Sequence, residues 1–126
     1  MPSKSDCCIG SINLAAATNY LDIWWASPAG SESGWGINFN HQGDTIFATW
    51  FTFGSDGKPV WYVVGAVKTA ANTYAGKLYT GTGPPYNAAT YDPALVVPAE
   101  VGSVTLTFAD GNNATFAYTV NGVTQS

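Results

Sequence analysis

The chain contains no arginine, and charged residues of any kind are scarce. They make up 10 % of the 126 residues, against roughly 25 % in a typical soluble domain. Eight carboxylates face four lysines, so the formal net charge is −4. A surface that binds nucleic acid needs clustered lysine or arginine to displace counterions. We therefore expect neither nucleic acid nor an anionic membrane surface as a partner.

The sequence also has no long apolar run. A membrane-spanning helix needs about 18 or more consecutive, largely apolar residues, and no such stretch is present. Residues 1–6 lack the apolar core of a signal peptide. We expect no membrane insertion, and export would require a leader that has been removed from this sequence.

Histidine and cysteine are too few for an ordinary metal site. His41 is the single histidine, and the two cysteines, Cys7 and Cys8, are adjacent. Adjacent cysteines rarely meet disulfide geometry, so these are either incidental thiols or a link between two chains. Zinc and copper need several such ligands, and the turn 110–113 offers only part of the oxygen shell that calcium requires. We expect no metal and no other cofactor.

Catalytic groups are equally sparse. His41 and Asp44 could lie within hydrogen-bond reach across a turn, but no Gly-x-Ser-x-Gly motif presents a nucleophile to them. Glu32 and Asp44 are the nearest approach to a carboxylate pair for glycoside hydrolysis, and nothing in their spacing sets their separation. We expect a non-enzymatic protein in which His41 stabilises its turn.

Polarity comes instead from asparagine, threonine, serine and glycine, and aromatic residues are abundant. Surfaces of this composition are common in secreted bacterial β-domains, and they suit neutral polar ligands such as glycans. We therefore expect a secreted or cell-surface protein.

Apolar segments with strand-like alternation, separated by turn residues, predict an all-β fold. Asp56-Gly57 and Asn121-Gly122 are preferred hairpin turns, and a long irregular stretch is expected over 81–102. We expect an antiparallel meander of seven or eight strands that forms a small barrel or a sandwich. The expected strands are 35–41, 45–53, 59–67, 73–80, 103–109 and 114–120.

The buried face of each strand is predicted from the alternation of its residues. Strands 45–53 and 59–67 are apolar on both faces. They are therefore either central strands covered on both sides or strands that expose one aromatic face for binding. The residues expected to be largely buried are Phe39, Phe47, Phe51, Trp61, Val63, Leu106, Phe108, Phe116 and Tyr118.

The two ends of the chain predict an assembly. Residues 1–22 show no clear period and form an N-terminal extension, and 23–126 form a single all-β domain. Only four residues follow the Asn121-Gly122 turn, which is about half of a typical strand. The exposed edge of strand 114–120 is then expected to pair with another copy, with residues 1–22 of a neighbour as the candidate exchanged strand. The alternative is that the native chain continues past Ser126.

Short aromatic and glycine-containing motifs mark the first half of the chain. They are Trp24-Trp25, Glu32-Ser-Gly-Trp-Gly36, Gln42-Gly-Asp44, Phe47-Ala-Thr-Trp-Phe51, Asp56-Gly57 and Pro59-Val-Trp-Tyr62. With related segments farther along, this pattern resembles a β-domain of secreted bacterial, mainly proteobacterial, proteins. There the domain often accompanies proteases or other extracellular parts. The resemblance covers residues 20–126 and implies no activity.

Aromatic side chains are the strongest functional signal. An aromatic plane stacks on the apolar C–H face of a sugar ring, while nearby asparagine and aspartate supply hydrogen bonds. Trp35, Trp50 and Trp61 also suit the core of a small β-domain. At least one of Trp24 and Trp25 is expected to be exposed, because adjacent side chains on an extended chain point opposite ways. The candidate ligand-binding residues are Trp24, Trp25, Trp35, Trp50, Tyr86 and Tyr91.

Three functions fit these observations. The leading one is a non-enzymatic extracellular binding or adhesion module for a glycan or a surface polymer. The second is a structural subunit that assembles by β-strand complementation between chains. The third is a small barrel that encloses an apolar ligand.

Overall fold

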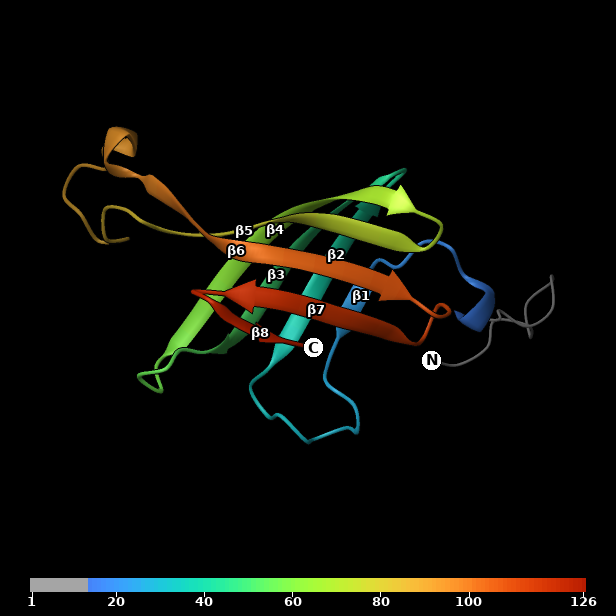
Figure 1. The fold of residues 1–126 in the computed structure, drawn as a ribbon. Helices are drawn as coiled ribbons and strands as arrows, with labels where there is room; N and C mark the ends of the chain where they lie inside the picture. Colours follow the sequence, from blue (N-terminus) through green and yellow to red (C-terminus); the bar gives the residue numbers. More distant parts are fainter. Residues whose placement is uncertain (1–13) are drawn as a thin grey trace, which may run out of the picture.

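The computed structural model describes residues 14–126, which form one antiparallel sheet of eight strands (Figure 1). Within these residues the helices are two single 3₁₀ turns, η1 (Leu14–Ala16) and η2 (Pro93–Leu95), and neither has the length or apolarity to cross a membrane. The strands are β1 (Asp22–Trp24), β2 (Gly36–Gln42), β3 (Thr45–Phe53), β4 (Pro59–Ala70), β5 (Thr73–Thr82), β6 (Val97–Phe108), β7 (Ala114–Val120) and β8 (Val123–Gln125).

The sheet curls into a half-barrel, which confirms the predicted all-β antiparallel meander. Neighbouring strands follow chain order, so a single sheet forms rather than the two facing sheets of a sandwich. The end strands of the described chain, β1 and β8, do not pair with each other. The half-barrel therefore stays open between its first and last strands.

Residues with positive φ lie where the hairpins turn. Asn121 (φ 48°) and Gly122 (φ 84°) supply the two positive values of a type I′ turn between β7 and β8. Gly57 (φ 77°) lies in the β3–β4 turn. These values confirm both predicted turns. The irregular segment is shorter than expected, 83–96 rather than 81–102, because β5 and β6 continue as a paired hairpin.

The pairing of β2 with β3 decides which apolar face of β3 lies inside. Ile37 is buried and lies opposite Trp50, and directly opposed residues share one face of a sheet. Phe47 and Phe51 therefore point to the convex face, where Trp61 of β4 pairs with Phe51. The predicted burial of Phe47, Phe51 and Trp61 is wrong, since about half of each side chain is exposed. Both faces of these strands are apolar, so alternation alone does not distinguish them.

The core fills the concave side of the half-barrel. Three other predicted core residues, Phe39, Leu106 and Phe108, are buried. Val63, Phe116 and Tyr118, also predicted to be buried, are half-buried. The buried apolar side chains are Tyr20, Ile37, Phe39, Ile46, Ala48, Trp50, Tyr62, Val64, Ala66, Tyr74, Leu78, Val104, Leu106 and Phe108.

Tyr20 covers the end of the half-barrel where β2 and β6 finish. Its ring stacks on Phe108 with centroids 3.7 Å apart and an interplanar angle of 3°. Its backbone N–H donates to Nδ1 of His41 over 2.9 Å. Tyr20 and Asp22 of β1 therefore belong to the folded domain, which begins earlier than the boundary drawn between residues 22 and 23.

The segment before Tyr20 also contacts its own domain. The backbone N–H of Gly111, in the turn after β6, donates to the carbonyl of Ala15 over 3.0 Å. This part of the predicted exchanged strand thus lies against the same chain. Residues 1–13, with Cys7 and Cys8, lie outside the described residues, and the predictions for them stay predictions.

The β5–β6 hairpin extends past the other strands as an arm (Figure 1). Leu78 pairs with Gly102, and the next pair leaves out Val101, which forms a bulge in β6. A bulge bends its strand and increases the local twist. The arm therefore leaves the half-barrel at this point and carries the 83–96 loop away from the opening.

Candidate functional site

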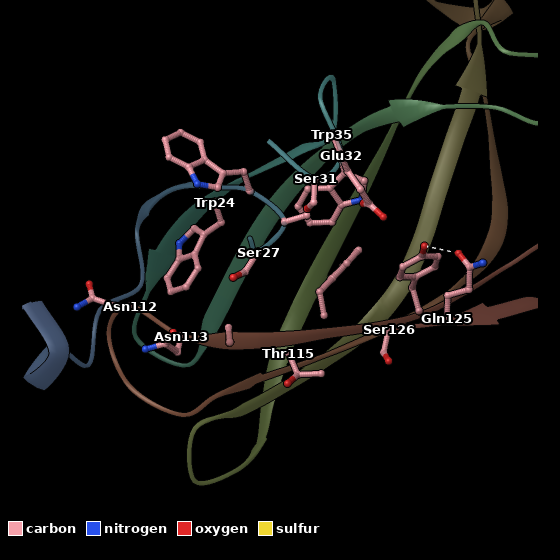
Figure 2. A pocket seen from close by; sticks show the side chains of 15 residues that line it. Trp24, Ser27, Ser31, Glu32, Trp35, Asn112, Asn113, Thr115, Gln125 and Ser126 are labelled. Carbon is pink, nitrogen blue, oxygen red and sulfur yellow. Dashed lines mark hydrogen bonds between the residues drawn. The ribbon is translucent and has the colours of Figure 1, made fainter. Parts of the chain in front are cut away.

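A groove of about 660 Å³ lies at the opening between the two ends of the curled sheet (Figure 2). One wall is the end of β1 with the 25–35 loop, and the other is the turn after β6 with β7 and β8. The lining residues are Trp24, Trp25, Ala26, Ser27, Ser31, Glu32, Trp35, Asn112, Asn113, Ala114, Thr115, Phe116, Tyr118, Gln125 and Ser126.

Backbone hydrogen bonds shape the 25–35 loop. The Ser31 N–H donates to the Pro28 carbonyl and the Trp35 N–H to the Glu32 carbonyl, each over 3.0 Å. These turns bring Ser31, Glu32 and Trp35 to one side of the groove (Figure 2). Trp25, at the start of the loop, is 68 % exposed. Its indole is thus available to a ligand, as predicted for one of the two adjacent tryptophans.

Trp24 joins the groove to the core. Its Nε1–H donates to the carbonyl of Tyr20 over 3.0 Å. Its ring lies 5.7 Å from Phe39 and 5.6 Å from Phe108, measured between centroids. Trp24 therefore has a fixed orientation and presents its uncovered part to the groove, whereas Trp25 beside it is largely exposed.

An aromatic cluster forms the inner side of the groove. The Trp35 and Phe116 centroids are 5.8 Å apart, and those of Phe116 and Tyr118 are 5.1 Å apart. Trp50 lies behind this layer, 4.6 Å from Tyr118, and is buried. Its Nε1–H has no hydrogen-bond partner among the described residues. Three aromatic rings thus line the groove here, and Trp50 supports them without lining it.

Tyr118 gives the groove a polar contact between β7 and β8. Its hydroxyl donates to Oε1 of Gln125 over 2.7 Å (Figure 2). Burial raises the pKa of Tyr118, and the negative charge of Glu32 raises it further. The hydroxyl is therefore protonated and neutral at physiological pH, and the negative charge of Glu32 disfavours its ionisation.

Asparagines at the turn after β6 form the far end of the groove. Asp110 Oδ1 accepts hydrogen bonds from the Asn112 N–H over 2.7 Å and from Asn113 Nδ2 over 3.1 Å. These bonds, the Asn112 bond first, lower the pKa of Asp110. Asp110 therefore stabilises its own turn through these hydrogen bonds. Among the described residues no group of three or more His, Cys, Asp or Glu is arranged to hold a metal ion.

The charge of the groove is negative. Among the described residues, Glu32 is the one acidic side chain in its lining, and no lysine or histidine lines it. A smaller hollow of about 210 Å³ adjoins it, shares Trp24 and Trp25, and contains Asp22. Two lysines form ion pairs outside the groove. Nζ of Lys68 lies 4.0 Å from Oδ1 of Asp44, and Nζ of Lys77 lies 2.8 Å from Oε1 of Glu100.

The predicted ligand-binding residues do not all meet. Trp24, Trp25 and Trp35 come together in the groove, and Trp50 lies behind it. Tyr86 and Tyr91 are exposed in the 83–96 loop on the arm and do not line the groove. The arm extends past the bulge in β6, so these two tyrosines form a separate surface.

His41 is a buried structural residue. Its Nδ1 accepts the Tyr20 N–H, so Nε2 carries the proton in the neutral ring and donates to the Gly43 carbonyl over 2.9 Å. The Tyr74 hydroxyl lies 3.1 Å from the same nitrogen. These contacts tie the β2–β3 turn to the segment before β1 and agree with the turn-stabilising role expected for His41. Oδ1 of Asp44, the candidate partner of His41, lies 4.0 Å from Nζ of Lys68.

Glu32 and Asp44 lie at opposite ends of β2. The strand between them has seven residues, which span roughly 23 Å at about 3.3 Å per residue. Glycoside hydrolysis by a carboxylate pair needs a separation of roughly 5–10 Å. These two residues therefore do not form such a pair.

Several groove residues were not among the sequence-based candidates. Asn112 and Asn113 read as turn formers, and Phe116 and Tyr118 as core residues. The curl of the sheet brings this C-terminal hairpin opposite the 25–35 loop, far away in sequence.

Comparison of the chain with protein-family models, with curated proteins and with solved structures found no match.

Proposed function

We propose that this protein is a non-enzymatic binding module that holds a glycan or a surface polymer in the groove between β1 and β7–β8. The observation that carries the proposal is the lining itself. An exposed indole, Trp25, and the rings of Trp35 and Tyr118 lie in one open groove with serine, asparagine and glutamine side chains. A secreted or cell-surface location accords with this function and stays a prediction.

The lining matches the two kinds of surface on a sugar ring. The apolar C–H face stacks on an aromatic plane, and the hydroxyl groups around the ring exchange hydrogen bonds with amides and hydroxyls. Asn112, Asn113 and Gln125 supply amides, and Ser27 and Ser31 supply hydroxyls. The groove is open to solvent, as a site for an internal segment of a long polymer must be.

A binding role is favoured over hydrolysis by the same lining. Among the residues that line the groove, Glu32 is the one carboxylate side chain, and Asp44 lies at the far end of β2. A single acidic group does not provide the separate acid and base or nucleophile of the usual glycosidase mechanism. We propose that Glu32 contacts the ligand without a chemical step.

Trp25→Ala is expected to weaken glycan binding about tenfold or more, which corresponds to about 1.4 kcal/mol of binding free energy. The variant removes the exposed stacking surface and leaves the core intact. A glycan array identifies the oligosaccharide that the parent binds, and isothermal titration calorimetry then compares the two proteins.

Trp61→Ala is the matched control. Trp61 is 54 % exposed but lies on the convex face, so its removal deletes an exposed indole without changing the groove. We expect it to bind like the parent. Equal losses from both variants, or no bound oligosaccharide on the array, would refute glycan binding at the groove.

The second candidate function is assembly by strand complementation. β8 pairs with β7 through Tyr118, Thr119 and Val120. The β7 residues from Ala114 to Ala117 have no partner on that side among the described residues. Three of them also line the groove, so an added strand would enter the same opening.

Deletion of residues 1–13 tests exchange through the N-terminal segment. Light scattering after size-exclusion chromatography measures the mass of the full chain and of the shortened chain. We expect the full chain to be dimeric or larger and the shortened chain to be monomeric if this segment is exchanged. A monomeric full chain would count against assembly.

The third candidate function, enclosure of an apolar ligand, has less support. The concave side is filled by aromatic and aliphatic side chains. The groove is lined by amides, hydroxyls and a carboxylate beside its aromatic rings. Both features favour a polar ligand at an open site.

A further inference from the structure

The charged side chains around the groove limit which class of glycan it can bind. The inference drawn from them rests on the proposed function. Among the side chains that line the groove, the charged one is Glu32, and in the adjoining hollow it is Asp22. Within residues 14–126 neither lining contains lysine or histidine, and the sequence has no arginine. Among these described side chains a uronic acid or a phosphorylated sugar would find no cation, and its charge would meet two carboxylates.

We propose that the groove recognises a polymer of amino sugars whose amines are free and positively charged, and that Glu32 is the residue that selects the charge. An ammonium group beside Glu32 gains a charge-assisted hydrogen bond. The same group is attracted to the faces of the neighbouring aromatic rings. Glu32 and Trp35 lie on the same wall of the groove (Figure 2).

Glu32 is free to make this contact. Its carboxylate forms no hydrogen bond or ion pair within residues 14–126, although the backbone carbonyl accepts from Trp35. The other glutamate, Glu100, is held by Lys77 over 2.8 Å. Glu32 and Tyr118 line the same groove, and the charge of Glu32 contributes, after burial, to the raised pKa of Tyr118.

The rest of the lining favours a sugar over a lysine-rich peptide. A pyranose needs an aromatic platform with amides and hydroxyls around it. In the groove, Trp25 and Trp35 supply aromatic planes, and Asn113 supplies an amide.

The test compares three oligosaccharides of the same length with the full chain by isothermal titration calorimetry, at a pH where a sugar amine is protonated. They are an oligomer of glucosamine, an oligomer of N-acetylglucosamine and an oligomer of galacturonate. We expect the glucosamine oligomer to bind about tenfold more tightly than the acetylated one, the lower end for a charge-assisted contact at an exposed site. The galacturonate oligomer should bind weakest. Added salt should reduce the preference for the glucosamine oligomer.

Glu32→Gln should reduce affinity for the glucosamine oligomer about tenfold, to that of the acetylated oligomer, and leave the acetylated oligomer unchanged. Glu100→Gln is the matched control, because it removes the same charge outside the groove and should keep the parent preference. Equal binding of the charged and neutral oligomers by the parent would overturn the inference while leaving the glycan-binding function standing.

Two other results separate the inference from the function on which it rests. If none of the three oligomers binds and the glycan array is also blank, the glycan-binding function itself fails. A lysine-rich peptide that binds as tightly as the glucosamine oligomer, with the same loss in Glu32→Gln, would show a general cation site and overturn the assignment to sugars.

Discussion

Replacing Phe108 by alanine is expected to lower the free energy of unfolding by about 3–5 kcal/mol. Phe108 is 2 % exposed and stacks on Tyr20. It also lies against Phe39 and Tyr74, with centroids 5.7 Å and 6.0 Å away. The substitution leaves a cavity among the rings of Tyr20, Phe39 and Tyr74, which come from three different parts of the chain. Urea denaturation followed by tryptophan fluorescence measures the loss.

Phe51→Ala is the matched control for this loss. Phe51 is 51 % exposed on the convex face and pairs with Trp61. Its removal opens no cavity, and a cross-strand aromatic pair contributes about 1 kcal/mol or less. Similar losses for the two phenylalanines, or a larger loss for Phe51→Ala, would show that β3 turns its other face inward.

Gly102→Ala is expected to destabilise the protein by about 3 kcal/mol, the upper end of the range for overpacking. A Cβ atom on Gly102 would overlap the backbone carbonyl oxygen of Thr119 in β7. Both strands are paired there, since Gly102 lies opposite Val120. Neither backbone can move without breaking the β6–β7 ladder, so the strain is not relieved by a side-chain rotation. Thermal and urea unfolding both report the loss.

Gly65→Ala serves as the control, because a Cβ on Gly65 has no heavy atom within 4 Å. It makes the same chemical change in the neighbouring part of the sheet, and we expect its stability to stay within about 0.5 kcal/mol of the parent. If Gly102→Ala is as stable as Gly65→Ala, the close approach of β6 and β7 at the bulge is not as described.

The convex face carries a surface that the sequence left ambiguous. Phe47, Phe51 and Trp61 are each about half exposed there, and Phe53 and Val67 extend the patch along the same strands. Contiguous exposed apolar surface of this kind is typical of contact sites. It lies on the opposite face of the sheet from the core, so this patch is distinct from the lining of the groove.

The sequence by itself determined the fold class and most strand positions. Turn residues such as Asn121-Gly122 stop and reverse the chain through their own backbone preferences, and these preferences are local. The alternation in β2 and β6 has one apolar face, so the burial of Phe39 and Phe108 could be predicted. The exposure of one of the two adjacent tryptophans also follows from local geometry, because adjacent side chains on an extended chain diverge, and the structure shows that the exposed one is Trp25.

Only the tertiary structure decided the orientation of β3 and β4 and the composition of the groove. Phe51 and Trp50 are both apolar, and the pairing of Trp50 with Ile37 placed Trp50 inside. Glu32 and Gln125 are far apart in sequence and meet at the groove because the eight-stranded sheet curls and stays open between its end strands. Curl and closure depend on the summed twist of all strands and on packing inside the barrel, which no short window of sequence contains.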